Sequence, residues 1–258
     1  MTRTPFMIET EMGGAAPTIW LTNSADGNRL TGDDITALGH AVRAAGEDAA
    51  AHVVVIRAEG DDFCLGRIPT PKKDTPPSAL TLQEKVTGPI MGLYANVRAT
   101  PVPVLAVVQG EARGFGCAFT GQCDLAIASS NATFSMPEMD VNLPPTLAIS
   151  AVLGKVPIKK LTHLVYTREK ISAQEALMFG LVGEVCEPED LNARTDHIIG
   201  QLVDRRRPAL ETIKQYLATA PHVDTAAAAT MVGRWVGGVG RGGKAVPEWF
   251  PGVSRGTS

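Results

Sequence analysis

The residues with the clearest chemical potential are glycines that follow an apolar run in the middle of the chain. Residues 104–108 read VLAVV, and Gly110, Gly114 and Gly116 come soon after them. The run predicts a short buried strand, entered through two prolines, and a helix should begin near Gly114. Glycines at such a turn allow positive φ and close approach of a ligand, and the first N–H groups of a helix can bind an oxyanion. The spacing therefore predicts a binding site, unless the glycines serve only helix-on-strand packing.

A second segment of similar character lies upstream. Residues 62–69, DFCLGRIP, follow the apolar run Val53–Ile56 and also contain a glycine turn. Two strand ends of this kind can supply two N–H donors. A phosphate-binding loop does not fit, because no Lys-Ser or Lys-Thr pair follows and the glycines do not form GxGxxG.

Four blocks in this order resemble the enoyl-CoA hydratase/isomerase, or crotonase, superfamily. They are the two glycine segments, FSMPEMDVNLPP at residues 134–145 and ISAQEALMFGLVGEV at residues 171–185. The resemblance covers about residues 15–205. It implies an α/β fold, a crotonase-like ββα superhelix in which parallel strands form a spiral with helices outside, and a helical C-terminal region.

The resemblance implies an acyl-CoA thioester substrate whose carbonyl oxygen is held by two backbone N–H groups while an enolate forms. Aligned onto this chain, the donors of this oxyanion hole are Arg67 and Phe115. The family usually has small residues there, but a larger side chain removes no N–H group. Phe115 would be unfavourable at positive φ, and the Arg67 side chain is expected either to reach a phosphate or to point into solvent.

Glu138 matches the family's second catalytic glutamate and is expected to act as acid and base. It follows the apolar residues Phe134 and Met136, and burial there would raise its pKa toward a useful range. Outside this motif, a glutamate that caps a loop or pairs with an arginine would be the simpler interpretation.

The family's first catalytic glutamate falls on Ala118, so the pair of carboxylates that holds a water for hydration is incomplete. A single base can move a proton from one allylic carbon to another, which favours double-bond isomerisation. A hydratase with one glutamate, or a hydratase-lyase acting on an aromatic enoyl-CoA, remains an alternative, with Asp140, Asn142 or Glu111 approaching the water. An alternative from another class is a protein that binds acyl-CoA without turnover.

The same resemblance places further residues against the substrate. No cofactor is expected beyond the coenzyme A of the substrate, and no metal. Candidates for the CoA phosphates are Lys72, Lys73, Arg241 and Lys244, none of them assigned by a motif. The residues expected to bind substrate are Cys64, Leu65, Gly66, Gly114, Pro137 and Asn142, the last of which replaces the family's usual glycine.

Composition agrees with a compact enzyme. The chain has 258 residues, 44% hydrophobic and 20% charged, with a net charge of −3. These values predict a soluble protein with a sizeable core and no nucleic-acid partner. No apolar segment has the length of a signal peptide or a membrane span, and the four cysteines have no CxxC spacing, so we expect reduced core cysteines, no membrane partner and a cytoplasmic location.

Several elements must position these residues. A strand is expected at Thr18–Leu21, and a helix from Thr31 to about Ala45 with Thr31 and Asp34 as its capping pair. The proline-rich residues 69–78 predict an exposed loop. Further helices are expected around Pro89 to Arg98 and at residues 146–153 and 158–166.

The expected division places the spiral core at residues 1–195 and a helical region at 196–258 that serves oligomerisation and closure of the active site. By the resemblance, Trp235 and Trp249 either close over the ligand or pack between subunits. The expected assembly is a homotrimer or homohexamer.

Overall fold

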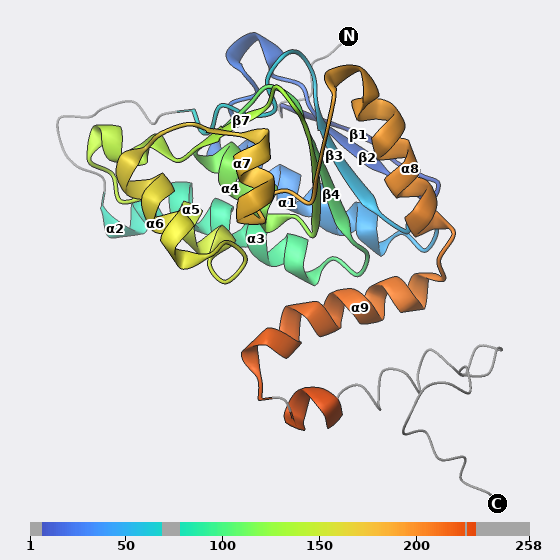
Figure 1. Cartoon of the computed structure of the whole chain (residues 1–258). Coiled ribbons are helices and arrows are strands. Elements are labelled where there is room, and N and C mark those ends of the chain that lie inside the picture. Colours follow the sequence, from blue (N-terminus) through green and yellow to red (C-terminus); the bar gives the residue numbers. More distant parts are fainter. Residues whose placement is uncertain (1–6, 69–77, 225, 231–258) are drawn as a thin grey trace, which may run out of the picture.

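The computed structural model describes residues 7–68, 78–224 and 226–230 (Figure 1). Its main sheet has six strands in the order β1-β2-β3-β4-β6-β9. All neighbours in it are parallel except β1 and β2. The strands are β1 (Ile8–Glu11), β2 (Thr18–Leu21), β3 (Val54–Ala58), β4 (Val104–Val108), β6 (Leu125–Ser129) and β9 (Glu184–Cys186).

A smaller sheet of three strands lies beside the main one, in the order β5-β7-β8. β5 (Glu111–Arg113) runs parallel to β7 (Thr133–Ser135), and β7 runs antiparallel to β8 (Ile171–Ser172). An isolated parallel bridge joins Cys64 to Ala112, so the segment after β3 is attached to the edge of this layer. The parallel strands with helices outside confirm the α/β class expected from the sequence.

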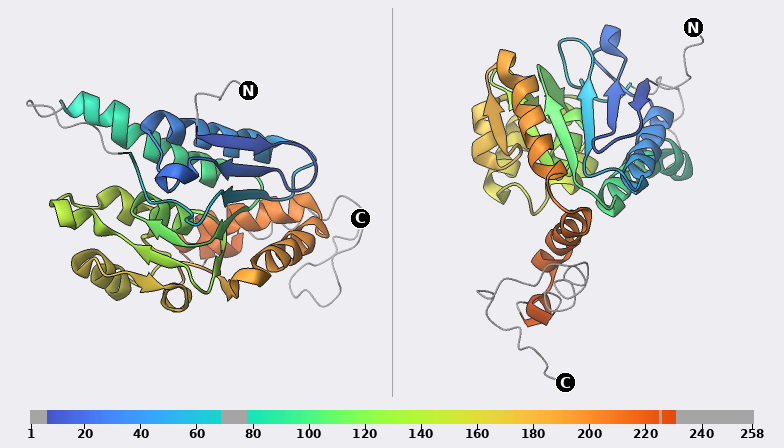
Figure 2. Two further views of the ribbon diagram at one scale, coloured as in Figure 1. Left: turned by 90° about the horizontal axis from the view of Figure 1, so that it is seen from above. Right: turned by 90° about the vertical axis from the view of Figure 1, so that its right-hand side faces the viewer.

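Most helices of the described residues pack around these sheets (Figures 1 and 2). Thr31 caps α1 in a reciprocal capping box with Asp34, as the sequence predicts. α2 continues through a π-helical turn at Gln83–Thr87 into α3. The helices are α1 (Gly32–Glu47), α2 (Ala79–Leu82), α3 (Gly88–Ala99), α4 (Phe115–Gln122), α5 (Thr146–Val152), α6 (Ile158–Thr167), α7 (Ala173–Phe179), α8 (Leu191–Val203) and α9 (Arg207–Thr219).

Both faces of the central strands are buried, which explains their continuous apolar runs. Val54 and Ile56 of β3 belong to the cluster packed with α1 and α3, whereas Val53 and Val55 belong to a cluster covered by α8. This alternation follows from the two-residue period of a strand. α8 spans the boundary expected between residues 195 and 196.

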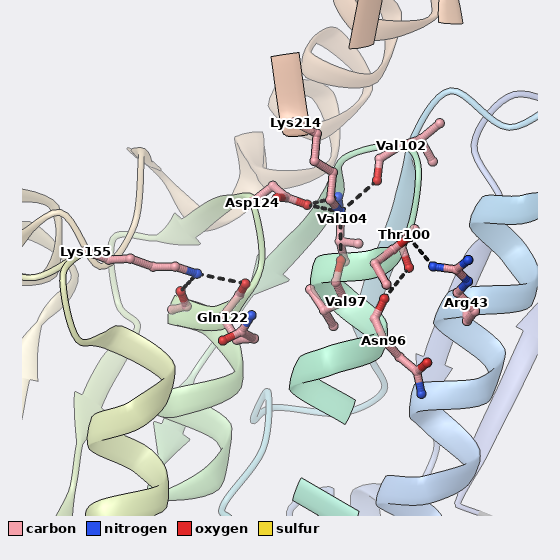
Figure 3. Close-up of polar contacts among 12 residues, drawn as sticks. Arg43, Asn96, Val97, Thr100, Val102, Val104, Gln122, Asp124, Lys155 and Lys214 are labelled. Carbon is pink, nitrogen blue, oxygen red and sulfur yellow. Dashed lines mark hydrogen bonds and ion pairs between the residues drawn. The ribbon is translucent and has the colours of Figure 1, made fainter. Parts of the chain in front are cut away.

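The helix α9 extends from the body of the molecule (Figures 1 and 2), and two of its cations bond to that body. Lys214 Nζ donates to the carbonyl oxygens of Val97 (2.8 Å) and Val102 (3.0 Å) and to Asp124 Oδ2 (2.7 Å), as Figure 3 shows. Arg207 Nη2 donates to the carbonyl oxygen of Gly46 at 2.9 Å. Lys214 thus donates to a carbonyl oxygen near the C-terminus of α3, and Arg207 to one near the C-terminus of α1. Positive charge is favourable at both places.

Some expectations fall on residues outside those described. They concern the loop at 69–77, Lys72 and Lys73 within it, and Trp235, Arg241, Lys244 and Trp249 near the C-terminus. Among the described residues, no helix is both long and apolar enough to cross a membrane.

Candidate active site

A cavity of about 670 Å3 collects most of the residues singled out by the sequence. Leu65, Gly66, Arg67 and Ile68 line one side of it, and Gly114 and Phe115 at the start of α4 line another. Pro137 and Glu138, together with residues of α3 and α5, complete the lining. Two segments far apart in the chain therefore meet one carboxylate.

The peptide between Gly66 and Arg67 is oriented by its neighbours. Gly66 has φ +106°, a value that few L-residues adopt, and its carbonyl oxygen accepts from the N–H of Leu30 at 3.2 Å. Since the N–H of a trans peptide points away from its carbonyl, the Arg67 N–H faces away from Leu30. No described residue accepts a hydrogen bond from it. This N–H group is available to a ligand in the cavity.

The N–H of Phe115 is the first of α4. Gly114 precedes it with φ +54° and ψ −113°, and the first bond within the helix runs from Ala118 N–H to the Gly114 carbonyl at 3.0 Å. The N–H of Phe115 therefore has no partner inside the helix. Phe115 itself is not at positive φ, and its ring stacks on Phe119 with centroids 5.9 Å apart. The large side chain thus packs inside the protein without straining the backbone.

Two glycines explain how close these segments come. A Cβ at Gly116 would lie 2.1 Å from the Cys64 carbonyl oxygen, so only glycine lets α4 pack against this segment. A Cβ at Gly114 would lie 3.1 Å from Glu138 Oε1. Gly114 therefore combines a required backbone conformation with a close approach to the carboxylate.

Glu138 lies in the 3-10 turn Pro137–Val141, and its Oε2 atom is buried without a hydrogen-bond partner among the described residues. Burial raises the pKa of Glu138, while a bond to its own backbone N–H and the charge of Arg113 lower it. Glu138 therefore has a raised pKa, and its Oε2 atom is free to accept a proton. Such a shift is typical of general acids and bases in enzymes.

Tyr94 adds a buried phenol to the same wall. It comes from α3, lines the cavity and is 1% exposed. Burial and the neighbouring Cys117 and Glu138 raise the pKa of Tyr94, so it stays protonated. No pattern in the sequence indicates Tyr94, because the segment that forms α3 carries no motif. Arg113 was also missed, although its position directly before Gly114 could have indicated it.

The carboxyl groups considered as partners of Glu138 are engaged elsewhere or absent. Ala118 is fully buried and offers no polar group. Asp140 lines the cavity, but its Oδ1 accepts from Arg168 Nε at 2.8 Å. Glu111 Oε2 accepts from Lys170 Nζ at 2.7 Å. Among the cavity's described carboxylates, Glu138 alone lacks an ion pair.

Two residues expected to bind substrate do not line the cavity. Cys64 is fully buried, and its thiol donates to the carbonyl oxygen of Asn28 at 3.2 Å, so it positions the segment before Arg67. Asn142 is exposed, with φ +56° at the end of the turn that carries Glu138. An asparagine tolerates this left-handed conformation, which explains how it can stand where a glycine is usual.

The cysteines and acidic residues do not suggest a metal centre. No group of His, Cys, Asp and Glu that could hold a metal ion occurs in the described ranges. The four cysteines are free thiols, and burial raises the pKa of both Cys64 and Cys123 to about 12. These thiols are packing residues and not nucleophiles.

Comparison with known families agrees with this geometry. The family model described as enoyl-CoA hydratase/isomerase matches residues 13–232. Crotonyl-CoA hydratase of Syntrophomonas wolfei is 31% identical over 193 residues, covering 72% of each protein. The human enoyl-CoA hydratase domain-containing protein 3 is 32% identical over 158 residues, which cover 61% of this chain and 52% of that protein. The chain thus matches about half the length of this relative.

Solved structures show the same fold. The crystal structure of the human domain-containing protein 3 superposes with a TM-score of 0.84 at 26% identity, covering 91% of this chain and 92% of that one. A structure described as an enoyl-CoA hydratase of Thermobifida fusca in complex with CoA has a TM-score of 0.79 at 24% identity, covering 90% and 92%. At that identity, the second comparison supports the fold alone.

Proposed function

The chain belongs to the enoyl-CoA hydratase/isomerase family, and from that premise we propose that it moves a double bond in an acyl-CoA thioester with Glu138 as its single base. Enzymes described as hydratases are among its relatives, which supports an acyl-CoA substrate.

Two backbone N–H groups support the enolate step. The N–H groups of Arg67 and Phe115 are unpaired among the described residues, and both residues line the cavity that holds Glu138. A thioester carbonyl placed there would receive two hydrogen bonds that strengthen as negative charge develops on the oxygen. A preorganised donor of this kind contributes about 3 kcal/mol to stabilisation of the transition state.

Proton transfer then needs one group that accepts and returns the same proton. Glu138 removes a proton from the carbon next to the thioester of a 3-enoyl-CoA, giving a dienolate. The protonated carboxyl returns it to the far carbon, so the double bond moves into conjugation with no gain of water. The raised pKa of Glu138 suits both steps, because a carboxyl group whose pKa is closer to neutral pH can both accept and release a proton there.

Isomerisation is favoured over hydration because no second carboxylate at the described cavity is free of an ion pair. Hydration by two carboxylates needs a second free one, but Asp140 pairs with Arg168, and Ala118 replaces the other family position. The names of the relatives favour hydration, and Asp140 does line the cavity. Hydration therefore stays the second candidate, with Asp140 released from Arg168 to hold the water.

The test compares two carboxylate-to-amide changes in one cavity. Glu138→Gln keeps size and hydrogen bonding but removes the base, so isomerisation of 3-enoyl-CoA should fall by about 10³-fold or more while binding of CoA esters is kept. Asp140→Asn is the matched control and should lower the rate less than about tenfold. Equal rates in wild type and Glu138→Gln would exclude this base and favour a protein that binds acyl-CoA without turnover.

A further inference from the structure

Arg67 brings to the wall of the cavity a positive charge that has no ion pair with any described residue. Its side-chain Nε is buried and has no hydrogen-bond partner among the described residues. None of the ion pairs found in residues 7–68, 78–224 and 226–230 includes Arg67. Arg67 as a whole is partly exposed, but its Nε atom is shielded from water. A buried donor without an acceptor is costly and calls for an explanation.

The other charges at the cavity do not satisfy this guanidinium. Arg29 lines the same cavity but pairs with Asp26 at 2.7 Å. Asp140 pairs with Arg168. Glu138 keeps its own Oε2 free, and the cation that acts on it is Arg113. Among the described residues, no carboxylate pairs with Arg67, and a ligand in the cavity can supply the negative oxygen.

The position of Arg67 indicates which part of a ligand supplies this negative oxygen. The backbone N–H and the guanidinium both belong to Arg67. If the N–H binds the thioester carbonyl, the guanidinium can bind only groups of the ligand that lie close to the thioester. In a CoA ester, the pantetheine arm separates the sulfur from the phosphates by many bonds. A carboxylate on the acyl chain can lie only a few bonds from the thioester, which suits the short reach of one side chain.

We infer that the preferred substrate is a CoA thioester whose acyl chain itself carries a carboxylate, and that Arg67 binds this carboxylate. The inference rests on the proposed function for the place of the thioester. The rest of the lining is consistent with a short chain between the two groups, because Leu82, Val86, Ile90 and Leu147 offer apolar walls. Arginine suits the task, since its planar fork matches both oxygens of a carboxylate.

The experiment compares two 3-enoyl-CoA esters of equal chain length, one ending in methyl and one in carboxylate. Binding is measured by calorimetry on Glu138→Gln protein, and kcat/KM is measured with Glu138 intact. Wild type should prefer the carboxylated ester by at least tenfold in both measurements, because a charge-assisted hydrogen bond commonly contributes this much. Arg67→Gln should abolish the preference, and Arg67→Lys should restore part of it by returning the charge.

Arg29→Gln is the matched control, because it removes a cation from the same wall that already has a partner. Arg29→Gln protein should keep most of the preference for the carboxylated ester. If Arg67→Gln weakens both esters and free CoA equally, the anion is a phosphate of CoA and the inference is overturned. A wild type that prefers the methyl ester also overturns it. A preference seen in binding without any turnover would keep the inference and refute the proposed function.

Discussion

Two atoms define this site at the level of single residues, because each is a buried polar atom that the described protein leaves without a partner. They are Glu138 Oε2 and Arg67 Nε. One can accept a proton and the other can donate to an anion. Such atoms also occur at Trp20, Asn28 and Ser129, but Glu138 and Arg67 line one cavity, where a ligand can complete both.

The charge of Arg113 should lower the pKa of Glu138, the proposed base. Glu138 acts as a base only when ionised, so kcat/KM should be lost as pH falls through its raised pKa, at a higher pH than for an ordinary glutamate. Arg113 favours the ionised form, and its removal raises that pKa further. Arg113→Gln should therefore move the acidic limb of the pH profile to higher pH.

The exposed, remote Arg205→Gln serves as control for the loss of one positive charge and should leave the limb in place. A limb that stays in place or moves to lower pH in Arg113→Gln would show that this carboxylate does not control the reaction.

Part of the site could be predicted from the sequence. Glycine spacing indicates a turn that binds a ligand, whereas the roles of Glu138 and Ala118 come from the resemblance to the family. Tyr94 could not be predicted, because it reaches the cavity through the packing of α3. The unpaired state of Arg67 could not be predicted either, since it depends on where distant carboxylates lie.

At the level of elements, the start of α4 does most of the positioning. Gly114→Ala forces a side chain onto φ +54° and places its Cβ 3.1 Å from Glu138 Oε1. Both the Phe115 N–H and the carboxylate should shift, so kcat should fall by about 10²-fold, a typical cost of a small misplacement. Steady-state kinetics beside thermal unfolding would separate lost activity from lost stability.

Gly200→Ala in α8 is the control for glycine replacement, since nothing lies within 4 Å of a Cβ there. It should be neutral or stabilise the helix by up to about 1 kcal/mol. Full activity in Gly114→Ala would mean that this close approach is not needed.

Lys214 should decide whether α9 stays attached. Its side chain is 5% exposed and its ammonium makes three hydrogen bonds, so Lys214→Met removes this donor from two carbonyl groups and leaves Asp124 Oδ2 with the Val104 N–H. The free energy of unfolding should fall by about 2 kcal/mol, less than for a fully buried pair because Asp124 is partly exposed.

Denaturant unfolding of Lys214→Met beside the exposed Lys159→Met checks this, and the control should change stability by less than about 0.5 kcal/mol. Equal stability of the two variants would show that α9 is held by something other than this cation.

Elements with strong local signals were predicted well. The strands at Thr18–Leu21 and Val104–Val108 have the bounds expected from their apolar residues, and the Thr31 capping box is present. The attachment of α9 was not predictable, because a buried lysine looks like any surface lysine until its partners on α3 and before β6 are known.

For the whole molecule, the described chain leaves large apolar side chains uncovered on α6 and α9. Ile213 and Leu217 of α9 are 56% and 64% exposed, and Ile158 and Tyr166 of α6 are 64% and 69% exposed. Contiguous exposed apolar surface is typical of subunit contacts. Assembly into trimers or hexamers, and a closing role for the C-terminal region, stay predictions.

The central claim is that one glutamate moves a double bond without adding water. The most direct measurement is to incubate the whole protein with 3-enoyl-CoA esters, neutral and carboxylated, and to identify the products by absorbance and mass. We predict a conjugated 2-enoyl-CoA of unchanged mass. A product that has gained one water, formed as fast as the conjugated ester or faster, would contradict single-base isomerisation and identify the enzyme as a hydratase.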